Sequence, residues 1–166
     1  MKTFILLLLL TFNPFPKQAQ EDCPCCSSEH HEFDFWIGEW EVFNEKGDKI
    51  GENLVEALED HCIISENWKG ATGTSGKSFS YYDSKDQTWN QLWISNSGNI
   101  LKLKGTASKG KMVLKSDLQE SEKGKFYNQV TWTKNPDGSV TQNWILLDEN
   151  GKKIGKAFKG IYKKKN

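Results

Sequence analysis

Arginine is absent from this 166-residue chain: all 22 basic residues are lysines, and 22 acidic residues balance them. Bidentate recognition of phosphate or guanine depends on the guanidinium fork, which lysine does not provide. With no net positive charge either, the composition argues against nucleic-acid binding. The one basic cluster, at 163–165, is explained by a solvated tail and needs no partner.

Long hydrophobic runs are lacking too, except at the start. Residues 4–12 form a compact apolar segment behind Lys2, and polar residues 17–20 follow. This layout is typical of a secretory signal peptide, and the run is too short for a transmembrane helix. We expect cleavage after Gln20 and a soluble exported product, periplasmic or extracellular, of about 145 residues, enough for one core. Cys23 does not directly follow small or apolar residues, so we expect no lipid anchor.

Catalytic motifs are missing as well. Segment 73–76 lacks the G-x-S-x-G frame, and with three histidines in the chain no Ser-His-Asp arrangement is legible. The acidic residues of 32–41 could pair as an acid and a base. Glu39 and Glu41, however, alternate with Gly38 and Trp40 as on a solvated strand face. The sequence therefore predicts no catalytic residues.

Four cysteines follow the predicted cleavage point: Cys23, Cys25, Cys26 and Cys62. An exported chain meets an oxidising compartment, where disulfides are the default. Four cysteines allow three complete pairings, and the strain of a bridge between adjacent residues disfavours the one that joins Cys25 to Cys26. We expect one of the three N-terminal cysteines, Cys26, to pair with Cys62, and leave the partners of Cys23 and Cys25 open.

The histidines beside these cysteines suggest a second interpretation. His30, His31 and His61, together with free thiols, would offer ligands for copper or zinc. Their spacing matches no C-x₂-C…H-x₃-H frame, and export favours oxidation of the thiols. We therefore favour disulfides and expect no metal site.

From residue 36 onward no helical period is long enough to predict a helix, and short apolar segments alternate with turn signals. Gly, Asn and Asp in those turns supply the positive φ that hairpins need. A meander of short strands favours an all-β fold, a single closed up-and-down antiparallel barrel, because closure removes free edges. We divide the chain into a signal peptide (1–20), an N-terminal Cys/His segment (21–32) and a barrel domain (33–166). The ten predicted strands cover 36–43, 50–58, 62–68, 78–82, 88–94, 100–104, 111–116, 126–133, 140–147 and 154–162.

Residues 33–40 read Phe-Asp-Phe-Trp-Ile-Gly-Glu-Trp. This segment resembles the first-strand signature of the lipocalin-like proteins of the calycin superfamily, in particular a bacterial exported family with a Phe-Asp-Phe-Trp-x-Gly-x-Trp opening. The resemblance implies a barrel plugged at its closed end by Trp40, with Gly38 letting the backbone pass close by. Typical lipocalins stack an arginine of the last strand on this tryptophan. This chain has no arginine, and Lys159 or Lys163 could take its place only through a cation–π contact and the methylene stem of the side chain.

Nitrobindin-like barrels, another branch with this shape, bind haem through a histidine on a late strand. The three histidines of this chain all precede the predicted fourth strand. The position that haem ligation needs is therefore empty, and we expect neither haem nor another cofactor.

Seven tryptophans suggest an aromatic interior. Residues alternate between the two faces of a barrel strand, so Trp89, Gln91 and Trp93 share one face. Polar glutamine and tyrosine interleave with the rings, which a dry core would rarely accept without partners. For any single ring, filling the barrel remains the simpler explanation. For the set we expect a cavity that binds a small hydrophobic or amphipathic molecule, lined by Tyr82, Gln91, Trp93, Gln129, Trp132, Gln142 and Trp144.

Two other functions remain open at this level. A calycin-like barrel could be an enzyme that uses carboxylates at the barrel mouth, which would require a buried carboxyl or tyrosine of perturbed pKa in the cavity. It could also be a structural or interaction module of the cell envelope, which would require a filled barrel and an exposed apolar patch. Our principal expectation is a binding barrel that performs no chemistry.

Overall fold

The structure, a computed structural model, describes residues 23–122 and 124–165, so the predicted signal peptide lies outside the described residues. No helix of the described part is long and apolar enough to cross a membrane. The described residues form two short 3₁₀ helices and eleven strands: η1 (Ser28–His31), η2 (Asp34–Trp36), β1 (Gly38–Phe43), β2 (Lys49–Leu58), β3 (Ile63–Gly70), β4 (Ser75–Asp83), β5 (Thr88–Ser95), β6 (Ile100–Ser108), β7 (Lys111–Lys115), β8 (Gln119–Ser121), β9 (Gly124–Lys134), β10 (Val140–Leu147) and β11 (Lys153–Lys164).

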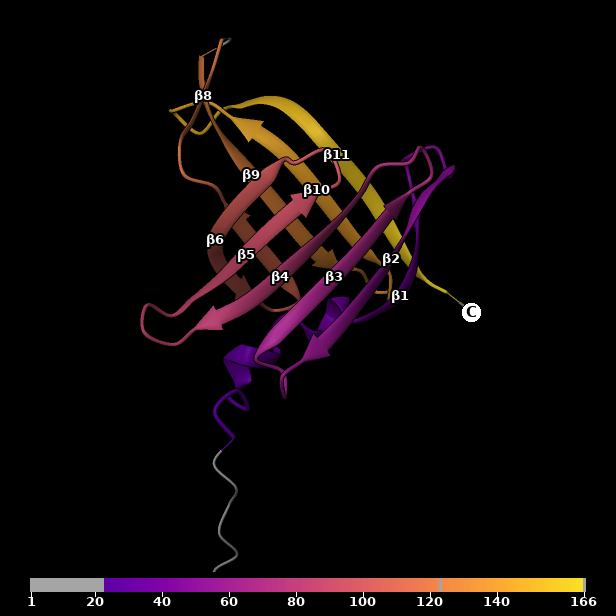
Figure 1. Cartoon of the computed structure of the whole chain (residues 1–166), viewed down its shortest axis with the longest axis vertical. Helices are drawn as coiled ribbons and strands as arrows, with labels where there is room; N and C mark the ends of the chain where they lie inside the picture. The colour runs from indigo at the N-terminus through magenta and orange to yellow at the C-terminus, as the bar shows by residue number, and fades with distance from the viewer. Residues whose placement is uncertain (1–22, 123, 166) are drawn as a thin grey trace, which may run out of the picture.

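Ten of these strands close into an antiparallel barrel, with η1 and η2 at its lower end (Figure 1). Each strand of the ring pairs with the next ring strand along the chain, with β7 pairing directly with β9, and β1 pairs with β11 to close the ring, with Trp40 opposite Lys164. The short β8 pairs only with the start of β9 and stands off the ring. The predicted all-β fold, a closed up-and-down barrel, is confirmed.

The first strand begins two residues later than predicted, at Gly38, because residues 34–36 form η2. Trp36 turns its ring under the barrel, where it stacks on Phe33 with ring centroids 4.9 Å apart and contacts Trp132 at 5.4 Å. All three side chains are buried. The aromatic run before β1 therefore covers the end of the barrel instead of extending the strand.

Trp40 lies at this closed end, 1% exposed. Its indole Nε1 donates a 2.8 Å hydrogen bond to the carbonyl of Trp36. The Lys164 ammonium lies 4.2 Å from the centroid of the Trp40 ring and donates to the carbonyl of Ile37 at 2.6 Å. Gly38 has a φ of +145°, and a Cβ there would meet the Lys164 ammonium. The glycine thus makes room for the lysine that caps the tryptophan.

The expectation that Lys159 or Lys163 would cap Trp40 is wrong, and strand alternation gives the reason. Lys164 has the parity of the buried Tyr162, so its exposed side chain lies on the same side of β11 and reaches the Trp40 ring. The two lysines named from the sequence have the opposite parity. Lys159 donates to Glu45, and Lys163 lies over the ring of Phe43, 5.2 Å from its centroid.

All four cysteines form disulfides, as predicted, but the pairing of Cys26 with Cys62 is wrong. The bridges join Cys23 to Cys26 and Cys25 to Cys62. A turn in which the Cys26 amide donates to the Cys23 carbonyl brings those two residues together. Cys25, buried between them, is left to reach the β2–β3 turn, with its Cα 5.1 Å from that of Cys62.

Candidate ligand cavity and its buried carboxyl group

The interior of the barrel holds a cavity of about 270 Å³. Its mouth is formed by the β3–β4 and β5–β6 turns, at the opposite end of the barrel from η1 and η2 (Figure 1). The residues lining the mouth are small and polar: Thr74, Ser75, Ser95, Asn96, Ser97 and Asn99. The closed end is filled by aromatic rings, so a ligand would enter through the mouth.

Two aromatic pairs form the walls of the cavity. Trp93 and Trp144 meet edge to face with centroids 6.2 Å apart, and Trp68 and Phe158 do the same at 5.9 Å. The Trp144 indole is oriented by a 2.9 Å hydrogen bond to Asn128. These four rings are only partly buried, in contrast to the rings of the closed end. Partly covered aromatic faces around a void are suited to an apolar ligand.

Glu66 on β3 is the one ionisable carboxyl among the described residues that line the cavity. Its side chain is buried and accepts two hydrogen bonds, from Asn53 Nδ2 at 2.9 Å and from Ser78 Oγ at 2.8 Å. Burial raises the pKa of this carboxyl to about 7, against the two hydrogen bonds, which lower it. Near neutral pH both the protonated and the ionised form are therefore populated, so the group can either donate or accept a hydrogen bond.

Tyr162 and two glutamines complete the polar side of the cavity. The Tyr162 hydroxyl donates to Gln142 Oε1. Burial, and next the negative charge of Glu66, raise the pKa of this phenol well above its ordinary value, so it stays neutral. Gln91 Nε2 donates to Ser80 Oγ at 3.0 Å. The polar groups are thus held in place by neighbouring strands before any ligand arrives.

Four of the seven predicted lining residues do line the cavity: Gln91, Trp93, Gln142 and Trp144. The other three lie elsewhere. Trp132 fills the closed end, 5.3 Å from Phe33 between ring centroids. Tyr82 also lies there, 6.1 Å from Trp89. Gln129 alternates with the buried Asn128 and Val130 and so faces the other side of β9.

The sequence-based prediction missed Glu66, Trp68, Phe158 and Tyr162. A signal was present for the first two, because Ile64, Glu66 and Trp68 alternate on one face of a predicted strand. An acidic residue between two large apolar ones on the same face indicates either a mistaken strand or a buried carboxyl. The structure shows the second.

No protein-family model matches the chain, and no curated protein matches it either. The closed ten-strand antiparallel barrel is consistent with the resemblance to calycin barrels.

Proposed function

We propose that this protein is an exported barrel that binds a small amphipathic molecule and performs no chemistry on it. The observation that carries the proposal is a cavity, open at one end, whose aromatic walls lead to a cluster of ordered polar groups. Ligand sites combine these two features, apolar walls for affinity and a few fixed polar groups for orientation. The cavity, at about 270 Å³, is slightly smaller than the range of roughly 300–1,000 Å³ for such sites. The ligand is therefore small.

The charge of the cavity restricts the polar end of the ligand. Glu66 is its ionisable carboxyl, and no lysine or histidine is among the described residues that line it. An anionic ligand would leave its own charge unpaired and, at alkaline pH, would face a second negative charge. An amine or an alcohol would instead find an acceptor in Glu66. We therefore expect a ligand with a neutral or positively charged head group.

A matched set of octyl compounds tests this proposal. Octylamine, octanol and octanoate share one apolar tail and differ in head-group charge. Titration of the oxidised mature protein should change its tryptophan fluorescence, saturate at one ligand per barrel, and rank octanoate weakest at pH 8. Mass spectrometry of small molecules that co-purify with the protein would identify the natural ligand. Fluorescence that no member of a broad apolar library perturbs would contradict the proposal.

A second candidate, an enzyme, is favoured by one specific observation. Glu66 has a pKa near neutrality in the same cavity as the Tyr162 phenol, and such a carboxyl could move a proton to or from a bound substrate. This carboxyl lies inside the barrel, below the mouth. NMR can follow the incorporation of deuterium from the solvent into a bound carbonyl compound. Incorporation by the wild-type protein that is lost in Glu66→Gln would favour the enzyme over the binding barrel.

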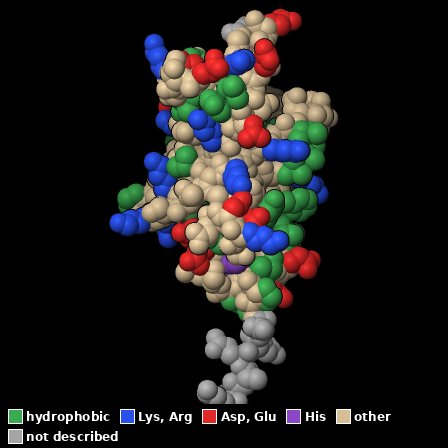
Figure 2. Space-filling view, turned by 90° about the vertical axis from the view of Figure 1, so that its left-hand side faces the viewer, with side chains coloured by type: hydrophobic (Ala, Val, Ile, Leu, Met, Phe, Trp, Pro, Cys, Tyr) green, Lys and Arg blue, Asp and Glu red, His purple; other side chains and the backbone are tan. Residues whose placement is uncertain are grey.

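The third function, an interaction module, requires a filled barrel, and the cavity disfavours it. Exposed hydrophobic side chains do lie on the outer surface, among them Phe79, Tyr81 and Ile94 on β4 and β5. Figure 2 shows hydrophobic side chains gathered along one edge of the molecule, with acidic side chains and lysines dispersed over the rest of that view.

A further inference from the structure

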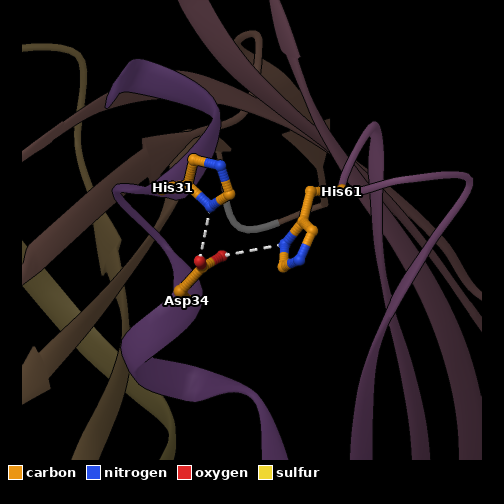
Figure 3. Close-up of side chains that lie close together, drawn as sticks. All are labelled: His31, Asp34 and His61. Atoms are coloured by element: carbon orange, nitrogen blue, oxygen red, sulfur yellow. Dashed lines mark hydrogen bonds and ion pairs between the residues drawn. The ribbon is translucent and has the colours of Figure 1, made fainter. Parts of the chain in front are cut away.

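Two histidines and an aspartate from separate segments meet outside the cavity, at the closed end of the barrel. His31 ends η1, Asp34 begins η2, and His61 lies in the β2–β3 turn. One potential ligand atom from each of the three side chains lies within 4.8 Å of those of the other two. Figure 3 shows both imidazole rings directed at the Asp34 carboxylate, and the two ring centroids lie 4.7 Å apart. None of the three residues lines the cavity.

One oxygen of the Asp34 carboxylate is hydrogen-bonded to His31, whereas the other oxygen is separated from His61 by a gap. Asp34 Oδ2 lies 2.7 Å from His31 Nδ1, which is a hydrogen-bond distance. Asp34 Oδ1 lies 3.7 Å from His61 Nδ1, which is too long. Asp34 Oδ1 and His61 Nδ1 are both buried from solvent, and neither has a hydrogen-bond partner within the described residues. Buried polar atoms are rarely left unpaired, so the gap calls for an occupant.

The separation of Asp34 Oδ1 and His61 Nδ1 is close to the spacing of two ligands of one metal ion, and a ligand atom of His31 lies within 4.8 Å of those of the other two residues. Zinc bonds to histidine nitrogen and carboxylate oxygen are about 2.0–2.1 Å long, which places two ligands of a tetrahedral ion about 3.3 Å apart. Closing the 3.7 Å separation of Asp34 Oδ1 and His61 Nδ1 to that value needs a shift of only a few tenths of an ångström. A proton alone could not bridge it.

We propose that His31, Asp34 and His61 form a binding site for a divalent transition-metal ion, with Zn²⁺ as the expected occupant. Two imidazoles and one carboxylate suit a borderline ion such as Zn²⁺, whereas Ca²⁺ and Mg²⁺ prefer six or more oxygen ligands. The side chains are 33–42% exposed although Asp34 Oδ1 and His61 Nδ1 are themselves covered, so the site lies at the surface, where an ion can enter after a small movement of the rings and keep a water molecule as its fourth ligand. The expectation of no metal site concerns the histidines together with free thiols. The thiols are all oxidised, and the proposed donor set combines two of those histidines with the Asp34 carboxylate instead.

The surrounding chain fixes the three ligands before an ion binds. The disulfide between Cys25 and Cys62 ties the turn that carries His61 to the segment that carries the other two ligands. Glu59, Asp60 and His61 have φ values of 49°, 51° and 67°, a left-handed conformation that non-glycine residues rarely adopt in succession. Strained backbone of this kind persists where the surrounding structure holds it, and it occurs often at functional sites.

Metal titration of the full oxidised protein tests the site. After removal of metal with EDTA and dialysis, calorimetry with ZnCl₂ should show one ion bound per chain, and Co²⁺ should give the visible absorption of a site with nitrogen ligands. His61→Ala and Asp34→Asn should each weaken Zn²⁺ binding by more than about 100-fold, since even outer-shell partners of a metal site are worth 10–100-fold. An excess of Mg²⁺ or Ca²⁺ should not displace the ion.

Two control variants distinguish specific metal coordination by the three side chains from nonspecific electrostatic attraction of cations. Asp60→Asn removes a negative charge from the same turn, at an exposed position where asparagine tolerates the positive φ. His30→Gln removes the histidine next to His31, whose ring bonds Ser27 instead of the cluster. Both should keep the affinity for Zn²⁺ within about twofold, with circular dichroism reporting the fold of every variant. Failure of the wild-type protein to bind Zn²⁺ at micromolar concentration would overturn the proposal, as would equal losses in the cluster and control variants.

Discussion

Ser78 lies directly opposite Glu66 in the β3–β4 ladder, and its hydroxyl donates a 2.8 Å hydrogen bond to Glu66 Oε2. On the other side of β3, the Asn53 amide of β2 donates to Glu66 Oε1. Three adjacent strands thus each contribute one polar side chain to the interior. This arrangement satisfies a carboxyl group that would otherwise be costly to bury, and it places the group at the cavity.

We predict that Glu66 makes the protein less stable as the pH rises. Burial raises the pKa of its carboxyl from 4.5 to about 7, so the folded protein keeps a proton that the unfolded chain releases between these values. The resulting stabilisation is fully present below pH 4.5 and is lost as the pH rises through 7. It amounts to at most about 3.5 kcal/mol, because one pKa unit corresponds to about 1.4 kcal/mol.

Urea denaturation of wild type and Glu66→Gln at pH 5 and pH 8 measures this effect. Glutamine keeps both hydrogen bonds, with the Ser78 hydroxyl turned to accept, and carries no charge at either pH. The variant should therefore gain about 1–3 kcal/mol relative to wild type between pH 5 and pH 8. Glu56→Gln, at an exposed site on β2, is the matched control and should follow the wild-type profile. Parallel pH profiles for wild type and Glu66→Gln would contradict the prediction.

Trp40→Ala should destabilise the protein by about 3–5 kcal/mol, the usual cost of deleting a buried large aromatic side chain. The ring is 1% exposed, and its loss would also free the carbonyl of Trp36 and uncover the Lys164 ammonium. Equilibrium denaturation by guanidinium chloride gives the free energy of unfolding. A melting temperature within one or two degrees of wild type would show that Trp40 does not close the barrel.

Strand alternation made the fold predictable from the sequence. It does not predict how far a residue lies along the barrel axis, between the closed end and the mouth. The face of Trp132 was assigned correctly, since it alternates with the buried Val130. Its position at the closed end depends on strand tilt and on the register between β9 and its neighbours, which a single sequence does not specify. Trp93 and Trp132 therefore looked equivalent from sequence, and only Trp93 lines the cavity.

Glu66 and the cysteines show a second kind of information that sequence pattern lacks. A charged residue is normally expected on the solvent side, and Glu66 points inward because Asn53 and Ser78 on neighbouring strands bond it. Likewise, Cys25 pairs with Cys62 because a local turn first joins Cys23 to Cys26. Both outcomes depend on contacts between segments, whereas the aromatic run before β1 could be recognised from its own residues.

The two disulfides should differ in their contribution to stability. The bridge between Cys25 and Cys62 spans 37 residues and that between Cys23 and Cys26 spans three. Loop-closure entropy then gives about 4 kcal/mol for the first and about 2 kcal/mol for the second. Denaturation of the Cys25→Ser/Cys62→Ser and Cys23→Ser/Cys26→Ser double variants compares them. The non-reduced wild type should take up no alkylating reagent, and stoichiometric labelling of Cys62 would refute this pairing.

Trp93→Ala and Trp132→Ala should separate ligand binding from folding. Trp93 lines the cavity and is partly exposed, so its removal should weaken binding of an octyl ligand by about tenfold, which corresponds to about 1.4 kcal/mol. Its cost in stability should be smaller than that of Trp132→Ala, because a ring at a void has fewer packing partners. Trp132 is fully buried between Phe33 and Trp36, so its removal should cost about 3–5 kcal/mol of stability.

The pair is informative because both variants lose an indole from the barrel interior, one near the mouth and one at the closed end. Binding is measured at a temperature where both variants are folded, by calorimetry, since each change also alters the tryptophan fluorescence. Trp132→Ala should then bind the ligand with nearly the wild-type affinity. If the two variants lost affinity equally, or if Trp93→Ala lost stability alone, the cavity would have no part in binding, and the barrel would have to act through its outer surface.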